Sequence, residues 1–318
     1  MDPGEKEDVR RSHQCTVSAL ERMRAGNYRA AVGNKETLAA IAAHYEINRS
    51  NIHNKIKLLE EDYASFRRIR QDGNNFYRSF MFSYLERVME TQDLYEFDRV
   101  RSRISQCRRM NAILGGHEYT FDELSQELQH VLERIIHAAP NSTSPDEFLL
   151  NCLDEHASLN VMIFFRLVTS IEIHMNSNYY RPKIHAEYRS MEEFVLEQAM
   201  IVDFETDQLR VKALSEALEI PTKVVQFDVL APVPELPKLP YCFFDGSSRR
   251  NFNLGLLSDD FLLISGSSDE HAVPATGPPS PAILDLRAPS YVTLVFWRGH
   301  YGVLYRNSVL SGLKHDFF

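Results

Sequence analysis

The sequence has few cysteines and no long apolar run. Its four cysteines, Cys15, Cys107, Cys152 and Cys242, are widely spaced and form no C-x-x-C pair. This spacing argues against a zinc knuckle and a disulfide framework, so we expect free thiols in a reducing compartment. The apolar runs are far shorter than the roughly 18 residues of a membrane-spanning helix, and MDPGEKEDVRRSHQ does not read as a signal peptide. We therefore expect a cytoplasmic or nuclear protein that does not bind a membrane.

The sequence also lacks an excess of positive charge and the common cofactor motifs. The 35 basic and 44 acidic side chains give a formal charge of -9, which opposes non-specific binding to nucleic acid. A Gly-rich phosphate loop, an H-E-x-x-H motif and an EF-hand loop are all missing from the sequence, so we expect no cofactor and no metal. A hydrophobic fraction of 44% over 318 residues is enough to build a core.

The composition divides the chain into three parts. We expect a flexible leader over residues 1–33, one domain over 34–306 and a C-terminal tail over 307–318. Within the domain, residues 231–290 contain APVPELPKLP and SGSSDEHAVPATGPPSP with little periodicity, which is typical of a long loop insertion. This insertion is either a flexible linker or a docking peptide for a partner.

Helical patterns come first along the chain and strand patterns come last. The spacing of apolar residues predicts a helix, a turn and a helix over residues 36–66, a helix starting near Asn75, and further helices over 93–114, 122–139, 144–176 and 190–200. Strands are predicted over residues 209–213 and 222–229, and a hairpin over 291–306. This order favours an α+β fold, with a helical lobe on a small sheet.

The stretch QDGNNFYRSFMFSYLE, residues 71–86, predicts a turn followed by a helix that presents position 75 at its N-terminus. Cysteine hydrolases use such a place for their nucleophile, because the helix dipole and the backbone N–H groups stabilise a thiolate and an oxyanion. They also need a histidine base and a third polar group that orients the imidazole. The predicted hairpin WRGHYGVLY carries His300, but position 75 is an asparagine.

These two segments resemble the otubain family, cysteine deubiquitinases of the ovarian-tumour class. Its members read D-G-N-C-F-Y-R at the nucleophile and G-H-Y-[D/N]-I-L-Y at the base, where this chain reads DGNNFYR and GHYGVLY. The segments FFRLVTS, ALSEALEI and VVQFD also match, so the resemblance runs from about Lys35 to Tyr305. It implies a papain-type cysteine protease fold, with a cleft where the 75–90 helix begins beside the 298–302 hairpin.

The resemblance places the family's catalytic positions on named residues. The nucleophile falls on Asn75, the base on His300 and the orienting Asp or Asn on Gly302, while Asp72, which shapes the oxyanion turn, is retained. A carboxamide is not nucleophilic at neutral pH, because its nitrogen lone pair is delocalised. We therefore expect an inactive otubain-like protein that regulates ubiquitin conjugation or signalling by binding ubiquitin, polyubiquitin or ubiquitin-conjugating enzymes.

The chain departs from the family pattern in two further places. It has Trp297 and Arg298 where the family has Arg-Pro, and MIVDFETDQ (200–208) where the family usually has a Glu-Pro-Met stretch that ends in Asp-His. The segments RRIR (67–70) and CRR (107–109) carry clustered positive charge, and we expect both to be solvated faces rather than a nucleic-acid track.

Two other functions stay open. The protein could be an active ubiquitin thioesterase that uses another residue, although Cys107 and Cys152 fall in helical patterns typical of buried, inert thiols. Residues 35–62 could instead form a DNA-binding helix-turn-helix. The acidic run Glu60, Glu61 and Asp62 and the overall negative charge argue against that reading. The plain alternative for the DGN turn and for His300 is a purely structural role.

Overall fold

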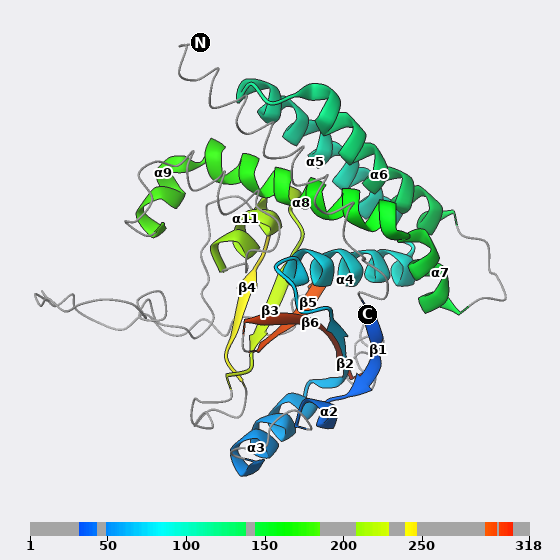
Figure 1. Ribbon diagram of the computed structural model, residues 1–318, viewed down its shortest axis with the longest axis vertical. Helices are drawn as coiled ribbons and strands as arrows, with labels where there is room; N and C mark the ends of the chain where they lie inside the picture. Colours follow the sequence, from blue (N-terminus) through cyan, green and yellow to red (C-terminus); the bar gives the residue numbers. More distant parts are fainter. Residues whose placement is uncertain are drawn as a thin grey trace, which may run out of the picture.

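The fold is a six-stranded mixed sheet with a large helical lobe on one face and two short helices on the other (Figure 1). The computed structural model describes residues 32–42, 49–137, 144–184, 208–228, 239–246, 290–297 and 299–307. The larger hydrophobic core lies between the sheet and the helical lobe, and a smaller one lies under the two short helices. The expected fold class, α+β with a helical lobe on a small sheet, is confirmed.

The strands run in the order β1-β2-β6-β5-β3-β4. They are β1 (Val32–Thr37), β2 (Tyr63–Ile69), β3 (Thr222–Gln226), β4 (Tyr241–Phe244), β5 (Val292–Trp297) and β6 (His300–Arg306). Only the pairing of β3 with β5 is parallel, and every other neighbouring pair is antiparallel. In this register Thr222 lies opposite Phe244 on one side and opposite Val292 on the other.

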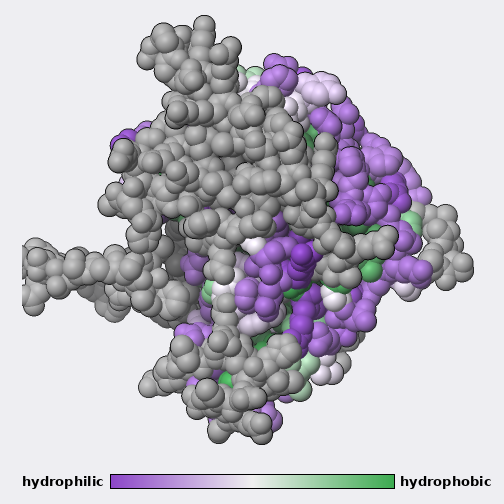
Figure 2. Space-filling model, in the orientation of Figure 1, coloured by the Kyte–Doolittle hydropathy of each residue, from purple (hydrophilic) through white to green (hydrophobic). Residues whose placement is uncertain are grey.

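The helical lobe is built from α4 to α11. The helices are α2 (Ala39–Ala42), α3 (Arg49–Glu60), α4 (Asn75–Thr91), α5 (Leu94–Ile113), α6 (Glu118–Ile136), α7 (Pro145–Cys152), α8 (Glu155–Met175), α9 (Ser177–Tyr180) and α11 (Gln208–Leu218), with a 3₁₀ turn at Arg181–Lys183. Side chains of Asp93, Ser144 and Asp154 cap α5, α7 and α8 by accepting backbone N–H groups, which is why these helices begin where they do. On the face shown in Figure 2, the described residues over α6 and α7 are mostly hydrophilic.

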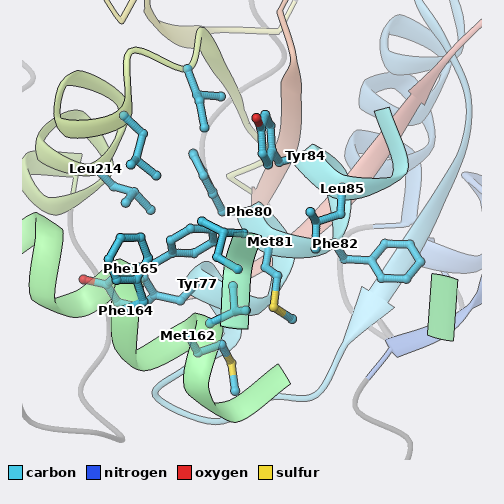
Figure 3. Close-up of a cluster of buried hydrophobic side chains, with 14 of the residues drawn as sticks. Tyr77, Phe80, Met81, Phe82, Tyr84, Leu85, Met162, Phe164, Phe165 and Leu214 are labelled. Carbon is cyan, nitrogen blue, oxygen red and sulfur yellow. The ribbon is translucent and has the colours of Figure 1, made fainter. Parts of the chain in front are cut away.

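Helix α4 lies at the centre of the fold. It packs on β5 and β6 with one side and on α6 and α8 with the other, so 13 of its 17 residues are buried. Figure 3 shows Tyr77 and Phe80 of α4 beside Phe164 and Phe165 of α8, and the rings of Phe80 and Phe165 meet edge to face with centroids 5.4 Å apart. This packing fixes the N-terminus of α4 against the sheet.

Helix α8 forms the buried side of the helical lobe. Among the described residues it alone has the length and hydropathy of a membrane span, and 78% of the apolar window is buried inside the protein. The fold uses this apolar helix as a core element, with α6, α11 and α4 packed around it.

Arg67 is a buried arginine in the middle of β2. Its guanidinium donates hydrogen bonds to the Gly33 carbonyl oxygen (2.9 Å) and the Tyr305 hydroxyl (2.7 Å), and it pairs with the Asp146 carboxylate. The side chain is only 2% exposed, so the expectation of a solvated face over residues 67–70 is wrong at Arg67. Strand β2 contacts both α3 and α4, and Arg67 points toward α4, where its guanidinium lies 3.6 Å from the Glu86 carboxylate.

Several predicted elements are found with small changes. The hairpin over 291–306 is present as β5 and β6, the strand over 222–229 as β3, and the helices near Asn75, over 93–114 and over 122–139 as α4, α5 and α6. The helical pattern over 144–176 is divided into α7 and α8, because Asp154 caps a new helix. The pattern over residues 190–200 lies outside the described residues.

Other predicted elements are wrong. Residues 209–213 are helical in α11, because Val211, Leu214 and Leu218 form a buried face at helical spacing that packs on α8. Of the helix, turn and helix predicted over 36–66, the two helices are confirmed as α2 and α3, but the predicted range is too long, because it begins in β1 and ends in β2.

Two strands lie in ranges that were expected to be a flexible leader and a loop insertion. Strand β1 begins at Val32, inside the range assigned to the leader, and β4 lies within the range 231–290 assigned to the insertion. The rest of the leader, most of the insertion, and residues 308–318 of the tail lie outside the described residues.

We predict that Arg67→Met lowers the free energy of unfolding by about 3 kcal/mol, because it removes the cation from Glu86 and Asp146 and leaves the Gly33 and Tyr305 oxygens without this donor. Urea unfolding followed by circular dichroism measures the change. Arg68→Met is the control. The Arg68 side chain lies on the opposite face of β2 and is 25% exposed in its ion pair with Glu36, so the expected loss of unfolding free energy is below about 1 kcal/mol. Equal losses in both variants would contradict the role assigned to Arg67.

Candidate functional site

The turn before α4 is held by Asp72. Its carboxylate accepts two hydrogen bonds from the Arg78 guanidinium, at 2.9 and 3.1 Å, and a third from the backbone N–H of Asn74 at 3.0 Å. The Asp72 carbonyl oxygen accepts the backbone N–H of Asn75 at 3.0 Å. A two-pronged pair of this kind fixes both distance and plane, so the turn and the first turn of α4 form one rigid unit.

Arg166 of α8 holds the same turn from the opposite side. Its guanidinium donates to the Asn74 side-chain oxygen from two nitrogens, at 3.1 and 2.8 Å, and to the Gly73 carbonyl oxygen at 2.8 Å. It also lies over the Tyr77 ring, 4.4 Å from its centroid. The sequence analysis did not select Arg166 as a site residue. The available signal was an arginine inside the apolar helix NVMIFFRLV, because a buried arginine needs several acceptors.

Asn75 is the first residue of α4 and is 3% exposed. Its side-chain nitrogen donates to the Asp72 carbonyl oxygen at 2.8 Å, and its side-chain oxygen accepts the backbone N–H of Tyr301 at 3.2 Å. The carboxamide therefore connects the turn to strand β6, and both of its polar atoms form internal hydrogen bonds. The adjacent rings of Phe76 and Tyr301 reinforce this contact, with centroids 5.2 Å apart.

His300 is the first residue of β6 and lies opposite Trp297 of β5. It is partly buried, and its Nδ1 atom has no hydrogen-bond partner among the described groups. Asn75 reaches this strand one residue further on, at the backbone of Tyr301. The structure thus brings Asp72, Asn75 and the start of β6 together.

Gly302 lies two residues after His300 and opposite Val295. A Cβ atom at this position would lie 2.7 Å from the Arg67 carbonyl oxygen, and 2.7 and 2.8 Å from two ring atoms of Trp297. No polar side chain can therefore stand at position 302 beside His300 without a rearrangement. Arg298, the other departure in this hairpin, lies outside the described residues.

The three cysteines that the structure describes are poorly suited to act as nucleophiles. Cys107, Cys152 and Cys242 are all buried, which confirms the burial expected for Cys107 and Cys152. Burial raises the pKa of the Cys107 thiol to about 11 and also raises the pKa of Cys152 and of Cys242. Cys15 lies outside the described residues.

The parts of the chain that the structure describes hold no metal site, and one of the basic residues of α3 is buried. No group of three or more His, Cys, Asp or Glu side chains is arranged to hold a metal ion there. In α3, Ile52, Ile56 and Leu59 pack into the smaller core. Lys55 is 2% exposed and donates to the Asp228 carbonyl oxygen. That lysine is therefore not exposed for contact with phosphate.

Comparison with known proteins agrees with this geometry. The family described as Peptidase C65 Otubain matches residues 25–306. The ovarian tumor domain-containing deubiquitinating enzyme 1 of Arabidopsis thaliana is 30% identical over 275 residues, covering 86% of this chain and 80% of that protein. The ubiquitin thioesterase OTUB1 of Homo sapiens is 25% identical over 197 residues, covering 62% of this chain and 70% of that protein.

Solved structures show the same fold. The complex of h/ceOTUB1 with ubiquitin aldehyde and UBCH5B~Ub superposes with a TM-score of 0.65 at 19% identity, covering 92% of this chain and 96% of that one. The complex of ceOTUB1 with ubiquitin aldehyde and UBC13~Ub gives a TM-score of 0.62 at 19% identity, with 91% and 97% covered.

We predict that Asn75→Ala lowers the free energy of unfolding by about 2 kcal/mol, because it removes the acceptor of the buried Tyr301 N–H and a donor to the Asp72 carbonyl. Chemical denaturation measures the loss. The control is Asn54→Ala on the exposed surface of α3, where the expected change is within about 0.5 kcal/mol. If Asn75→Ala lowers the free energy of unfolding no more than Asn54→Ala does, the hydrogen bonds of the Asn75 carboxamide do not stabilise the fold.

We also predict that Cys107 in the folded protein reacts very slowly with iodoacetamide at pH 7. Its pKa of about 11 lies above the ordinary thiol value, so the thiolate is rare at neutral pH and increases roughly tenfold per pH unit up to the pKa. Peptide mapping by mass spectrometry at a series of pH values follows the labelling. The control is the same protein in urea, where labelling should become fast at lower pH. Rapid labelling of folded Cys107 at pH 7 would contradict the assignment.

Proposed function

The chain belongs to the otubain family, peptidase C65, and from this premise we propose that it is a catalytically inactive member that binds ubiquitin or polyubiquitin through its otubain-like domain, residues 34–306. The observation that carries the proposal is the Asn75 carboxamide at the position where the family has its nucleophilic cysteine.

The carboxamide cannot replace a thiolate. Its nitrogen lone pair is delocalised, so it does not attack a carbonyl carbon at neutral pH. In this chain both polar atoms of Asn75 are also engaged, one with Asp72 and one with Tyr301, and the side chain is buried. Asn75 thus has a structural role, and an acyl intermediate cannot form on it.

The rest of the catalytic set is also changed. Gly302 offers no group to orient His300, and the buried Nδ1 of His300 has no partner among the described residues. A histidine base needs that partner to hold its tautomer and to stabilise the imidazolium. The three described cysteines are buried thiols with raised pKa values, so none of them is suited to act as a replacement nucleophile.

Binding can persist when the chemistry is lost. Contacts remote from the reacting carbon contribute to affinity without contributing to the chemical step, so they survive loss of the nucleophile. The relatives named above are deubiquitinating enzymes and ubiquitin thioesterases, and related structures hold ubiquitin aldehyde with UBC13~Ub or UBCH5B~Ub. We extend this partner class to the present chain: ubiquitin, and with it a ubiquitin-charged conjugating enzyme whose activity the chain would regulate by binding.

One observation favours the second candidate, an active deubiquitinase. The turn that would build an oxyanion site is intact, with Asp72 held by Arg78 and Asn74 held by Arg166. An unrecognised nucleophile near this turn would restore a working centre, so the test must report on covalent chemistry as well as on binding.

We predict saturable binding of mono-ubiquitin or of at least one differently linked di-ubiquitin, measured by isothermal titration calorimetry with the full chain. Ubiquitin with its hydrophobic surface patch mutated serves as the control ligand. If no member of the panel binds, the proposal is wrong at its binding step.

Catalytic inactivity is tested with a ubiquitin vinyl probe that forms a covalent adduct with an active-site thiol. We expect no adduct by intact-mass spectrometry, under conditions where an active otubain is labelled completely. An adduct mapped to any of the four cysteines would establish the second candidate instead.

A further inference from the structure

We infer that Trp297 blocks position 302, where the otubain family has its third catalytic residue. The indole lies so close to Gly302 that no larger side chain fits there. This inference deepens the proposed function, since it concerns the same centre. Its geometry nevertheless holds whether or not the chain binds ubiquitin.

The first step is the register of the β5–β6 hairpin. Trp297 lies opposite His300, and Val295 lies opposite Gly302. Residues that face each other across antiparallel strands, and their neighbours two positions along, point to the same face of the sheet. The indole is therefore on the face of β6 that carries positions 300 and 302, and it reaches diagonally from one to the other.

The second step is the absence of space above Gly302. The Cη2 and Cζ3 atoms of Trp297 lie 2.7 and 2.8 Å from the place of a Cβ atom at residue 302, closer than real Cβ contacts come. The glycine is not required by the backbone, because the positive-φ glycines among the described residues are Gly115, Gly246 and Gly299. It is required by the lack of space, because the Trp297 ring and the Arg67 carbonyl oxygen both lie within 2.8 Å of a Cβ atom at this position.

The third step is that neither neighbour of Gly302 can move aside easily. Trp297 is 8% exposed, and its ring meets Phe66 edge to face with centroids 5.9 Å apart. On the other side the Arg67 carbonyl oxygen lies 2.7 Å from the same Cβ position. That oxygen belongs to the backbone of β2, where the Arg67 side chain is fixed by Gly33 and Tyr305.

The family's catalytic site is thus lost in this chain through packing at position 302 as well as through replacement of its residues. A carboxylate at position 302 would require the indole to leave its place in the smaller core and β2 to move away from β6. No side chain at position 302 can then serve as a partner for the Nδ1 atom of His300, which has none among the described residues.

Trp297 is the only tryptophan in the sequence, so its fluorescence reports directly on this contact. We expect Gly302→Ala to change the emission spectrum of the folded protein, because the added methyl group displaces the ring. The same variant should lower the folding equilibrium constant about tenfold to a hundredfold, the usual effect of overpacking a core. Unchanged emission together with unchanged stability would overturn the inference.

A double-mutant cycle assigns this cost to Trp297. Trp297→Phe removes the two ring atoms that meet residue 302 but keeps an aromatic ring beside Phe66. In this background we expect the cost of Gly302→Ala to be at least fivefold smaller in the folding equilibrium constant, measured by circular dichroism during urea unfolding. A cost that is the same in both backgrounds would sink the inference, because the Arg67 carbonyl alone would then explain it.

The matched control is Gly33→Ala. A Cβ atom there would lie 3.1 Å from the Arg68 carbonyl oxygen, with Trp297 not among its three nearest atoms, so its cost should not depend on the residue at 297. If Trp297→Phe does not fold, the emission test on Gly302→Ala still decides the matter. None of these measurements uses ubiquitin, so a failure here and a failure of ubiquitin binding are told apart.

Discussion

Burial of helix α4 is the constraint on which the rest of the site depends. The helix is enclosed by β5 and β6 on one side and by α6 and α8 on the other, so its first residue has a fixed position relative to both. A side chain at that position must satisfy its own polar atoms within the protein, because water has little access to it. The Asn75 carboxamide does this with one donated and one accepted hydrogen bond.

The same position makes opposite demands on a catalyst and on a structural residue. A nucleophile needs a lone pair directed toward the substrate and a neighbouring base that takes its proton. A carboxamide that bridges two backbone groups has no such requirement and adds to stability. The contrast is an instance of the general trade-off between a strained, reactive site and a stable one.

Much of the fold could be predicted from the sequence, because the hairpin and the long amphipathic helices have clear periodic patterns. The failures have physical reasons. Strand β2 is covered on both faces and includes a buried arginine, so it shows no alternation, and α11 begins with residues that suit a strand equally well. Strand β4 is a short edge strand in a proline-rich region, where composition argues for a loop.

The candidate site was found only in part. Asp72, Asn75, His300 and Gly302 could be located from the resemblance, because they lie in short motifs. The sequence marks Arg166 as an arginine in an apolar helix and Trp297 as a departure from the family pattern. Their roles could not be predicted, because these depend on contacts between segments far apart in the sequence or on where an indole ring points. Periodicity reports which face a residue occupies, and it carries no information about such contacts.

The register of the sheet also bears on how this protein can vary. Phe244 and Val292 flank Thr222 on neighbouring strands, so the chain leaves the sheet and returns to it at points roughly 10 Å apart, two strand spacings. A connection between such close points costs only about 0.6 kcal/mol more for each doubling of its length. These points lie at the end of β5 opposite Trp297. The connection between these two points can therefore change in length over evolution at little cost to the sheet.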